Sequence, residues 1–279
     1  MKKSNLIEEV AAEVPDRRRF LQKMGIASAA VMAGAAVSKS QTTTAPAITD
    51  ADILTFALNL EYLEAEFYTV ATTGEYIDQA AGITITGSGT PGPTTGGQRV
   101  VLFTTGLLPL IMEIAADEQT HVKLIRGALT AAGVTPIAKP AINLGALGFG
   151  FVYQNDFLQL SRIFEDIGVT AYAGAAGLIQ SNAILQTAAE ILGTEAEHVG
   201  SIRTLMVMWG LSSITLDGVD VPPPPSGTQY FSTDANALVR QRTTGQVLYL
   251  AYGMKANATS GGFFPNGVNG KINTSTASA

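Results

Sequence analysis

The only two histidines of this 279-residue chain occur in the same short pattern. His121 follows Glu118 by three residues, and His198 follows Glu195 by three residues. Residues three apart lie on one face of an α-helix, so the carboxylate and the imidazole of each pair can reach the same metal ion. One Glu-x-x-His pair alone is more often a surface ion pair, but two of them on separate helices favour a metal site.

A site for two metal ions in a helix bundle also needs one carboxylate from each of two further helices. Glu165 is expected at the same level of the bundle as Glu195. About 16 residues, or roughly 24 Å of helix, lead from Glu165 to a turn, and about 13 residues, or roughly 20 Å, lead back from the turn to Glu195. On the segment 59–68, Glu61 and Glu64 both suit an inward face and stay alternatives, whereas Glu66 is expected in solvent. The candidate metal ligands are Glu61, Glu64, Glu118, His121, Glu165, Glu195 and His198.

Five more residues near these ligands have two interpretations each. Asp117, Glu113 and Glu197 are expected to be solvated or to contact a ligand from outside. Tyr68 and Tyr172 are either inward hydrogen-bond donors to the ligands or ordinary core aromatic residues.

Hydrophobic periodicity predicts the helices that must position these residues. They are expected at 50–73, about 98–132, 156–180 and 183–209, with a short fifth helix at 234–253. Pro109 either kinks the second helix or marks its true start. The predicted fold class is all-α: a four-helix bundle with a long crossover at 133–154. A Gly- and Pro-rich insertion at 74–98 follows the first helix, and its residues 83–86 are expected to form a short strand or one arm of a hairpin.

Composition excludes several classes of function. The chain has no cysteine, which rules out disulfides, zinc–thiolate sites and iron–sulfur clusters. A net charge of −6 and a pI near 5.0 argue against a nucleic-acid partner. Only 14% of residues are charged and the mean hydropathy is +0.23, which indicates long buried helices.

The N-terminal segment 1–47 is predicted to be an export signal and linker. Arg17, Arg18 and Arg19 precede Phe20, and an Ala- and Gly-rich apolar run follows at 24–37, too short to span a membrane stably. This order resembles a twin-arginine translocation signal. Small-x-small cleavage sites occur at 45–47 and 33–35, and an uncleaved amphipathic tail is the alternative. No later segment is long enough to cross a membrane, so the mature chain is expected to have no stable membrane span.

The motif set resembles the ferritin-like superfamily. The segments ALNLEYLEAEFY at 57–68, FEDIGVTAY at 164–172 and GGFFPNG at 261–267 are similar to the ferritin-like domain family that includes plant desiccation-related proteins. The resemblance covers nearly all of 48–270 and implies a ferritin-like bundle at 48–216. A Pro-rich linker, the short helix and a Gly-rich C-terminal extension then occupy 217–279. It also implies that Glu61 is the first-helix ligand, with Glu64 as a rival or an extra ligand.

Two hypotheses about function follow. The first is an exported protein with two Fe or Mn ions per chain that performs two-electron redox chemistry on peroxide or O₂, as a catalase, peroxidase or ferroxidase would. The second is a non-enzymatic envelope or desiccation and stress protein that uses the bundle as a scaffold. The expected partners are a metal ion or small-molecule oxidant, the twin-arginine translocase and, as an open alternative, further copies of the chain. The expected location is the periplasm, cell envelope or extracellular space.

Overall fold

The computed structural model describes residues 47–100 and 106–278, and the expected all-α fold is confirmed. The predicted export signal lies outside the described residues, apart from Ala47. The long helices are α3 (Asp50–Thr73), α5 (Leu107–Ala131), α6 (Gln154–Ala175) and α7 (Asn182–Met208). Shorter elements are α4 (Ile77–Ala80), the 3₁₀ turn η2 (Ala176–Leu178), α8 (Thr244–Ala251), β1 (Thr94–Thr95) and β2 (Ile142–Asn143).

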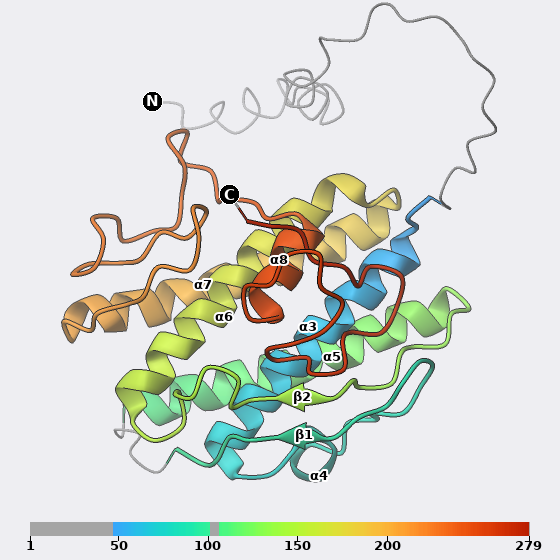
Figure 1. The fold of residues 1–279 in the computed structure, drawn as a ribbon, viewed down its shortest axis with the longest axis horizontal. Helices are drawn as coiled ribbons and strands as arrows, with labels where there is room; N and C mark the ends of the chain where they lie inside the picture. Colours follow the sequence, from blue (N-terminus) through green and yellow to red (C-terminus); the bar gives the residue numbers. More distant parts are fainter. Residues whose placement is uncertain (1–46, 101–105, 279) are drawn as a thin grey trace, which may run out of the picture. The chain divides into compact units, whose positions relative to one another are not determined.

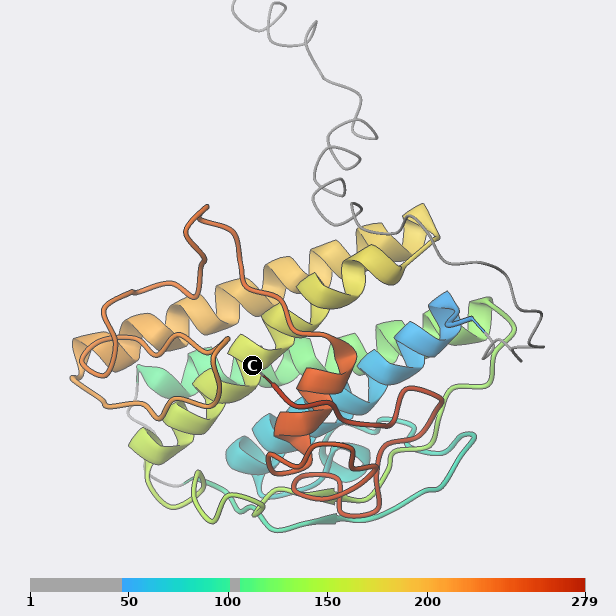
Figure 2. The same cartoon turned by 45° about the horizontal axis from the view of Figure 1, so that its top comes forward.

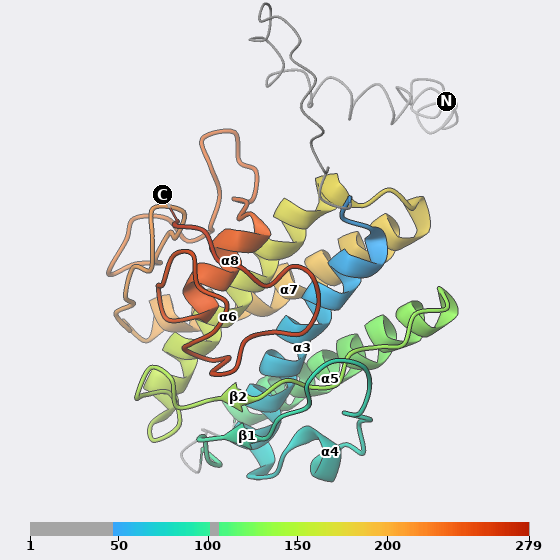
Figure 3. The same cartoon turned by 45° about the vertical axis from the view of Figure 1, so that its right-hand side comes forward.

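The four long helices pack in two pairs, α3 with α5 and α6 with α7 (Figure 1). Turning the molecule shows the same pairing from two other sides (Figures 2 and 3). The connection between α5 and α6 runs back along the bundle and contains β2, which is the long crossover that the sequence predicts (Figure 1).

Helix α3 is the most deeply buried element of the bundle. Thr49 and Asp52 form a capping box that starts it, and Gly74 ends it in the left-handed conformation at φ +84°. Phe67 lies at the centre of an aromatic cluster, stacked on Phe157 with ring centroids 4.8 Å apart. Such packing on every side explains why most of α3 is buried rather than one stripe of it.

Helix α5 begins later than the periodicity alone suggests. Residues 98–100 are not helical, and the Val100 N–H donates to the Ala71 carbonyl. Pro109 lies in the first turn, where a missing N–H costs nothing, so it marks the start of the helix rather than a kink.

The expectation of a strand or hairpin arm at 83–86 is wrong. Residues 85–92 instead exchange backbone hydrogen bonds with 136–139, for example from the Lys139 N–H to the Ile85 carbonyl. The small sheet lies further on, where β1 pairs with β2 in parallel. The insertion therefore pairs with the distant crossover, which a local hairpin signal cannot predict.

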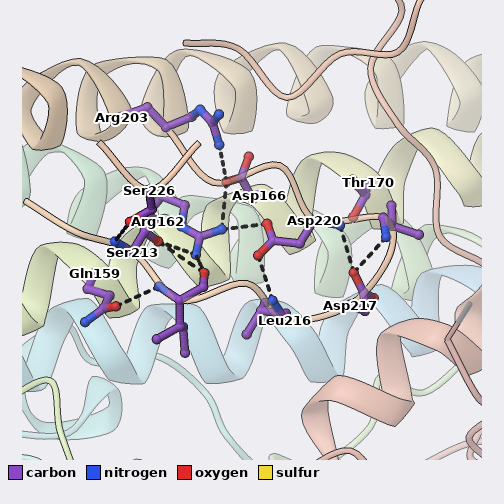
Figure 4. Close-up of polar contacts among 12 residues, drawn as sticks. Gln159, Arg162, Asp166, Thr170, Arg203, Ser213, Leu216, Asp217, Asp220 and Ser226 are labelled. Atoms are coloured by element: carbon purple, nitrogen blue, oxygen red, sulfur yellow. Dashed lines mark hydrogen bonds and ion pairs between the residues drawn. The ribbon is translucent and has the colours of Figure 1, made fainter. Parts of the chain in front are cut away.

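A buried ion-pair network ties α6 and α7 to the segment 213–230 (Figure 4). Arg162 donates to Asp220 at 2.6 Å, and Arg203 donates to Asp166 at 2.7 Å. Arg162 also donates to the Ser213 hydroxyl. Each of these charged side chains is almost fully buried, so each one needs its partner.

The fifth helix is shorter than predicted, because two local motifs set its start. The Asp234 carboxylate accepts the N–H groups of Asn236 and Leu238 in a turn, which removes 234–238 from any helix. Thr243 and Gln246 then form a capping box that begins α8.

The segment after α8 packs on the bundle, and Phe263 and Phe264 are buried in its hydrophobic core. No helix among the described residues is long and apolar enough to cross a membrane.

Candidate metal centre

Each of the four long helices carries at least one predicted ligand on its buried side. Both Glu-x-x-His pairs lie in mid-helix, as expected, on α5 and α7. All seven candidates are buried, and Glu118, Glu165 and Glu195 have no exposed surface. The site is therefore an acidic cluster in the interior of the bundle.

The first group of ligand atoms surrounds His121. Its Nδ1 lies 3.3 Å from Glu61 Oε2, 3.4 Å from Glu118 Oε2 and 3.6 Å from Glu195 Oε1. One donor atom from each of these four residues lies within 4.8 Å of all the others, a spacing that suits a single metal ion. Three helices, α3, α5 and α7, contribute to this group.

The second group surrounds His198 and shares a residue with the first. His198 Nδ1 lies 3.1 Å from Glu118 Oε1 and 3.2 Å from Glu165 Oε2. Glu118 thus directs one carboxylate oxygen at each histidine. The two groups together hold two imidazoles and four carboxylates from the four helices.

Two side chains outside these groups orient members of them. The Nε2 atom of His198 lies 3.2 Å from the half-buried Asp117 carboxylate, so the ring presents Nδ1 to the interior. The Tyr172 hydroxyl donates to Glu61 Oε1. Of the two interpretations of Tyr172, the structure supports the inward hydrogen-bond donor.

Tyr68 packs as a core aromatic, edge-on to Phe67 and Phe157. Burial, followed by the negative charge of Glu165, raises the pKa of its phenol well above the usual value. Glu113 and Glu197 are exposed, so of their two interpretations the structure supports the solvated one.

Many of the buried polar atoms at the centre have no hydrogen-bond partner. They include both oxygens of Glu118 and of Glu195, one oxygen each of Glu61 and Glu165, and His121 Nδ1. Unpaired buried carboxylate oxygens are very costly, and a cation is the group that satisfies several of them at once. The donor set of hard oxygen and imidazole ligands therefore fits a metal ion.

Burial is the main cause of the raised pKa values of three carboxyl groups at the centre. It raises the pKa values of Glu64, Glu165 and Glu195, and the negative charge of Glu118 raises all three further. A cation bound among these carboxylates would relieve this mutual repulsion.

The pKa values of the two histidines are raised for a different reason. Burial by itself lowers the pKa of an imidazole, but the charges and hydrogen bonds of the surrounding glutamates outweigh it. Glu61 and Glu118 raise the pKa of His121 to about 11. Glu118 and Glu165 do the same to His198, also to about 11.

Glu64 is the one candidate that belongs to neither group. It lies one turn from Glu61, faces Gly168 of α6 and makes no hydrogen bond or ion pair to another described residue. Between the two alternatives on α3, the structure brings Glu61 to the ligand atoms and places Glu64 beside them.

Glu66 is not solvated, contrary to expectation. Its side chain is fully buried, 3.2 Å from Lys139 Nζ, and accepts hydrogen bonds from Thr94 and from the Ile77 N–H. Its partners come from the insertion and the crossover, so the helical periodicity of α3 carries no signal for them.

The sequence of this chain is similar to those of known proteins. A family model described as ferritin-like domain matches residues 49–208. The chain is 23% identical over 271 residues to the ferritin-like catalase Nec2 of Nesocodon mauritianus, covering 80% of this chain and 84% of that protein. It is 27% identical over 189 residues to the desiccation-related protein PCC13-62 of Craterostigma plantagineum, covering 62% of this chain and 58% of that protein. Because the family model spans more than half of the sequence, this protein belongs to the ferritin-like domain family.

Proposed function

We propose that the acidic cluster binds two iron or manganese ions and performs two-electron redox chemistry on peroxide or O₂. The observation that carries the proposal is the position of Glu118, whose two oxygens lie 3.4 Å from one histidine and 3.1 Å from the other. A carboxylate in this position is suited to bridge two ions. A site for one ion would leave one of the two histidines unused.

The ligands divide into two sets around this bridge. Glu61, His121 and Glu195 would hold one ion, and Glu165 and His198 the other. The four carboxylates carry four negative charges, which two divalent cations neutralise. This balance resolves the repulsion that raises the carboxylate pKa values.

Two iron or manganese ions, each changing oxidation state by one, would supply the two electrons that cleave an O–O bond. The residues of the chain do the remaining work. Tyr172 holds Glu61 and Asp117 holds His198, so that one ligand in each set has a fixed orientation. The buried walls of the bundle keep bulk water from the ligands.

Carboxylate-rich sites suit iron and manganese better than soft metals, and the chain has no thiol, although the Irving–Williams order lets adventitious zinc bind the same ligands. The name of the Nesocodon relative, a ferritin-like catalase, supports peroxide as a substrate class for this protein.

We also propose that the chain is exported by the twin-arginine route, on the evidence of Arg17, Arg18 and the apolar run that follows. Because this route carries folded proteins, the metal ions would be inserted before export.

Metal analysis of protein purified from its native host tests the proposal. We expect two iron or manganese ions per chain, with absorption edges that identify the element. Glu118→Gln should lose both ions and peroxide turnover, whereas the matched variant Glu113→Gln, at an exposed position of the same helix, should retain them.

Much less than two ions per chain would refute the dinuclear centre. Two ions without turnover of peroxide and without O₂-dependent iron oxidation would refute the redox function and favour a scaffold role.

A further inference from the structure

A cavity of about 250 Å³ lies between α3, α6 and α8, next to the proposed metal centre. Its walls are almost entirely aliphatic and aromatic, including Leu63, Phe164 and Val247. Its mouth is apolar as well, because the exposed side chains of Leu147 and Met254 line it. A cavity with apolar walls and an apolar mouth favours an apolar ligand over water.

Glu64 is the only charged side chain among the lining residues. It is 5% exposed, and no hydrogen bond or ion pair joins it to another residue in the described part of the chain. A buried carboxylate that lines an apolar cavity needs a partner, and an O–H group of a bound molecule can provide one.

The inner end of the cavity touches the ligand set at Gly168. A Cβ atom built on this glycine would lie 3.5 Å from Glu64 Oε1 and inside van der Waals contact of Glu195 Oε2. The absent side chain therefore leaves the two carboxylates side by side. A polar group bound by Glu64 would lie beside Glu195, a ligand of the first set.

We propose that this cavity binds a small apolar molecule with one hydroxyl or hydroperoxyl group, which donates its O–H to Glu64. At the packing density of protein interiors, the cavity holds a molecule of roughly 180 Å³ van der Waals volume, about the size of one benzene ring with a short branched substituent. The inference rests on the proposed function, since the metal centre gives the bound oxygen atom a role. It narrows the peroxide class from hydrogen peroxide to alkyl or aryl hydroperoxides.

The probe is 2-phenyl-2-propanol, the unreactive alcohol that corresponds to an aryl-alkyl hydroperoxide. Binding to the metal-loaded protein is measured by ligand-observed NMR and compared with tert-butylbenzene, which has a methyl group in place of the hydroxyl. We expect saturable binding of the alcohol, at least tenfold tighter than the hydrocarbon.

Two variants locate the site. Ala251→Phe places a ring in the cavity and should weaken alcohol binding at least tenfold. The matched control Ala183→Phe enters a second apolar cavity of about 260 Å³, which contains no carboxylate, and should leave binding unchanged. Equal affinity of Ala251→Phe and the wild type, or no saturable binding to the wild type, would overturn the inference.

Glu64→Leu tests the head group. This variant should bind the alcohol and the hydrocarbon equally while it keeps the wild-type metal content. A preserved preference for the alcohol would overturn the inference, and so would loss of metal, which would make Glu64 a ligand.

The two proposals fail separately. A protein that holds two ions and decomposes hydrogen peroxide but does not bind the alcohol refutes only the cavity assignment. A protein that binds the alcohol but holds no metal refutes only the proposed function.

Discussion

Replacing Gly168 with alanine should separate the stability of the fold from the affinity of the metal centre. The new methyl group would overlap the Glu195 carboxylate, which lies at the end of a flexible side chain. Without metal, Glu195 can rotate away. With metal, it cannot do so without leaving the ligand set.

The two effects have opposite signs. Alanine in a helix interior is favoured over glycine by about 1 kcal/mol, so the metal-free variant should be as stable as the wild type or more stable. Overpacking by one methyl group costs about 1–3 kcal/mol in a close-packed site, and here that cost appears when metal binds. We therefore expect a loss of metal affinity of roughly 5- to 150-fold.

Urea unfolding of chelator-stripped protein measures the first quantity, and chelator competition for manganese measures the second. Gly193→Ala is the matched control, because this glycine lies on α7 with nothing within 4 Å of an added Cβ. It should raise the free energy of unfolding by a similar amount and leave metal affinity unchanged. If Gly168→Ala binds manganese as tightly as the wild type, the position assigned to Glu195 is wrong.

Three further predictions follow from the described contacts. Asp117→Ala frees the outer nitrogen of His198 and should reduce metal affinity by about 10- to 100-fold in the same competition assay, with unfolding of the stripped protein unchanged. Glu66→Ala leaves the buried ammonium of Lys139 without its carboxylate and should cost about 3–5 kcal/mol in urea unfolding, whereas a loss below 1 kcal/mol would mean that the pair is not buried in solution. Burial raises the pKa of Asp217, but hydrogen bonds from Arg242 and Ser278 outweigh burial and hold the pKa below its usual value. The stabilisation by the ionised Asp217 is therefore complete above about pH 4, and it is lost as the pH falls through the lower pKa of the folded state. The destabilisation caused by Asp217→Asn should accordingly shrink in acid. A destabilisation that stays constant from pH 7 to pH 3 would contradict this.

Much of the bundle could be predicted from local patterns. Helix α3 spans 50–73 as expected, because the capping box at its start and Gly74 at its end are both local signals of a few residues. The pairing of Glu118 with His121, and of Glu195 with His198, follows from helical spacing alone. The position of Glu165 beside Glu195 along the bundle follows from counting residues from Glu165 to the turn before α7 and back to Glu195.

What could not be predicted depends on contacts between distant segments. Glu66 is buried because Lys139 reaches it from the crossover, 73 positions later in the chain. Residues 83–86 form no strand, because the Ile83 N–H donates to the nearby Ile77 carbonyl while the Ile85 carbonyl accepts from Lys139 of the crossover. The choice between Glu61 and Glu64 also depended on tertiary contacts, since both lie on the same face of α3 and only Glu61 joins the group of ligand atoms around His121.

The link between Asn59 and Asn269 has a consequence for the timing of synthesis. The two residues exchange hydrogen bonds between the Asn59 amide and the Asn269 backbone across 210 positions. At about 5–20 residues per second, a ribosome needs roughly 10–40 s to travel from one to the other. During that interval the newly made α3 helix, which already carries Glu61 of the centre, lacks part of its final cover. Nascent chains of this protein should therefore depend on chaperones that shield an early helix until its late partner emerges.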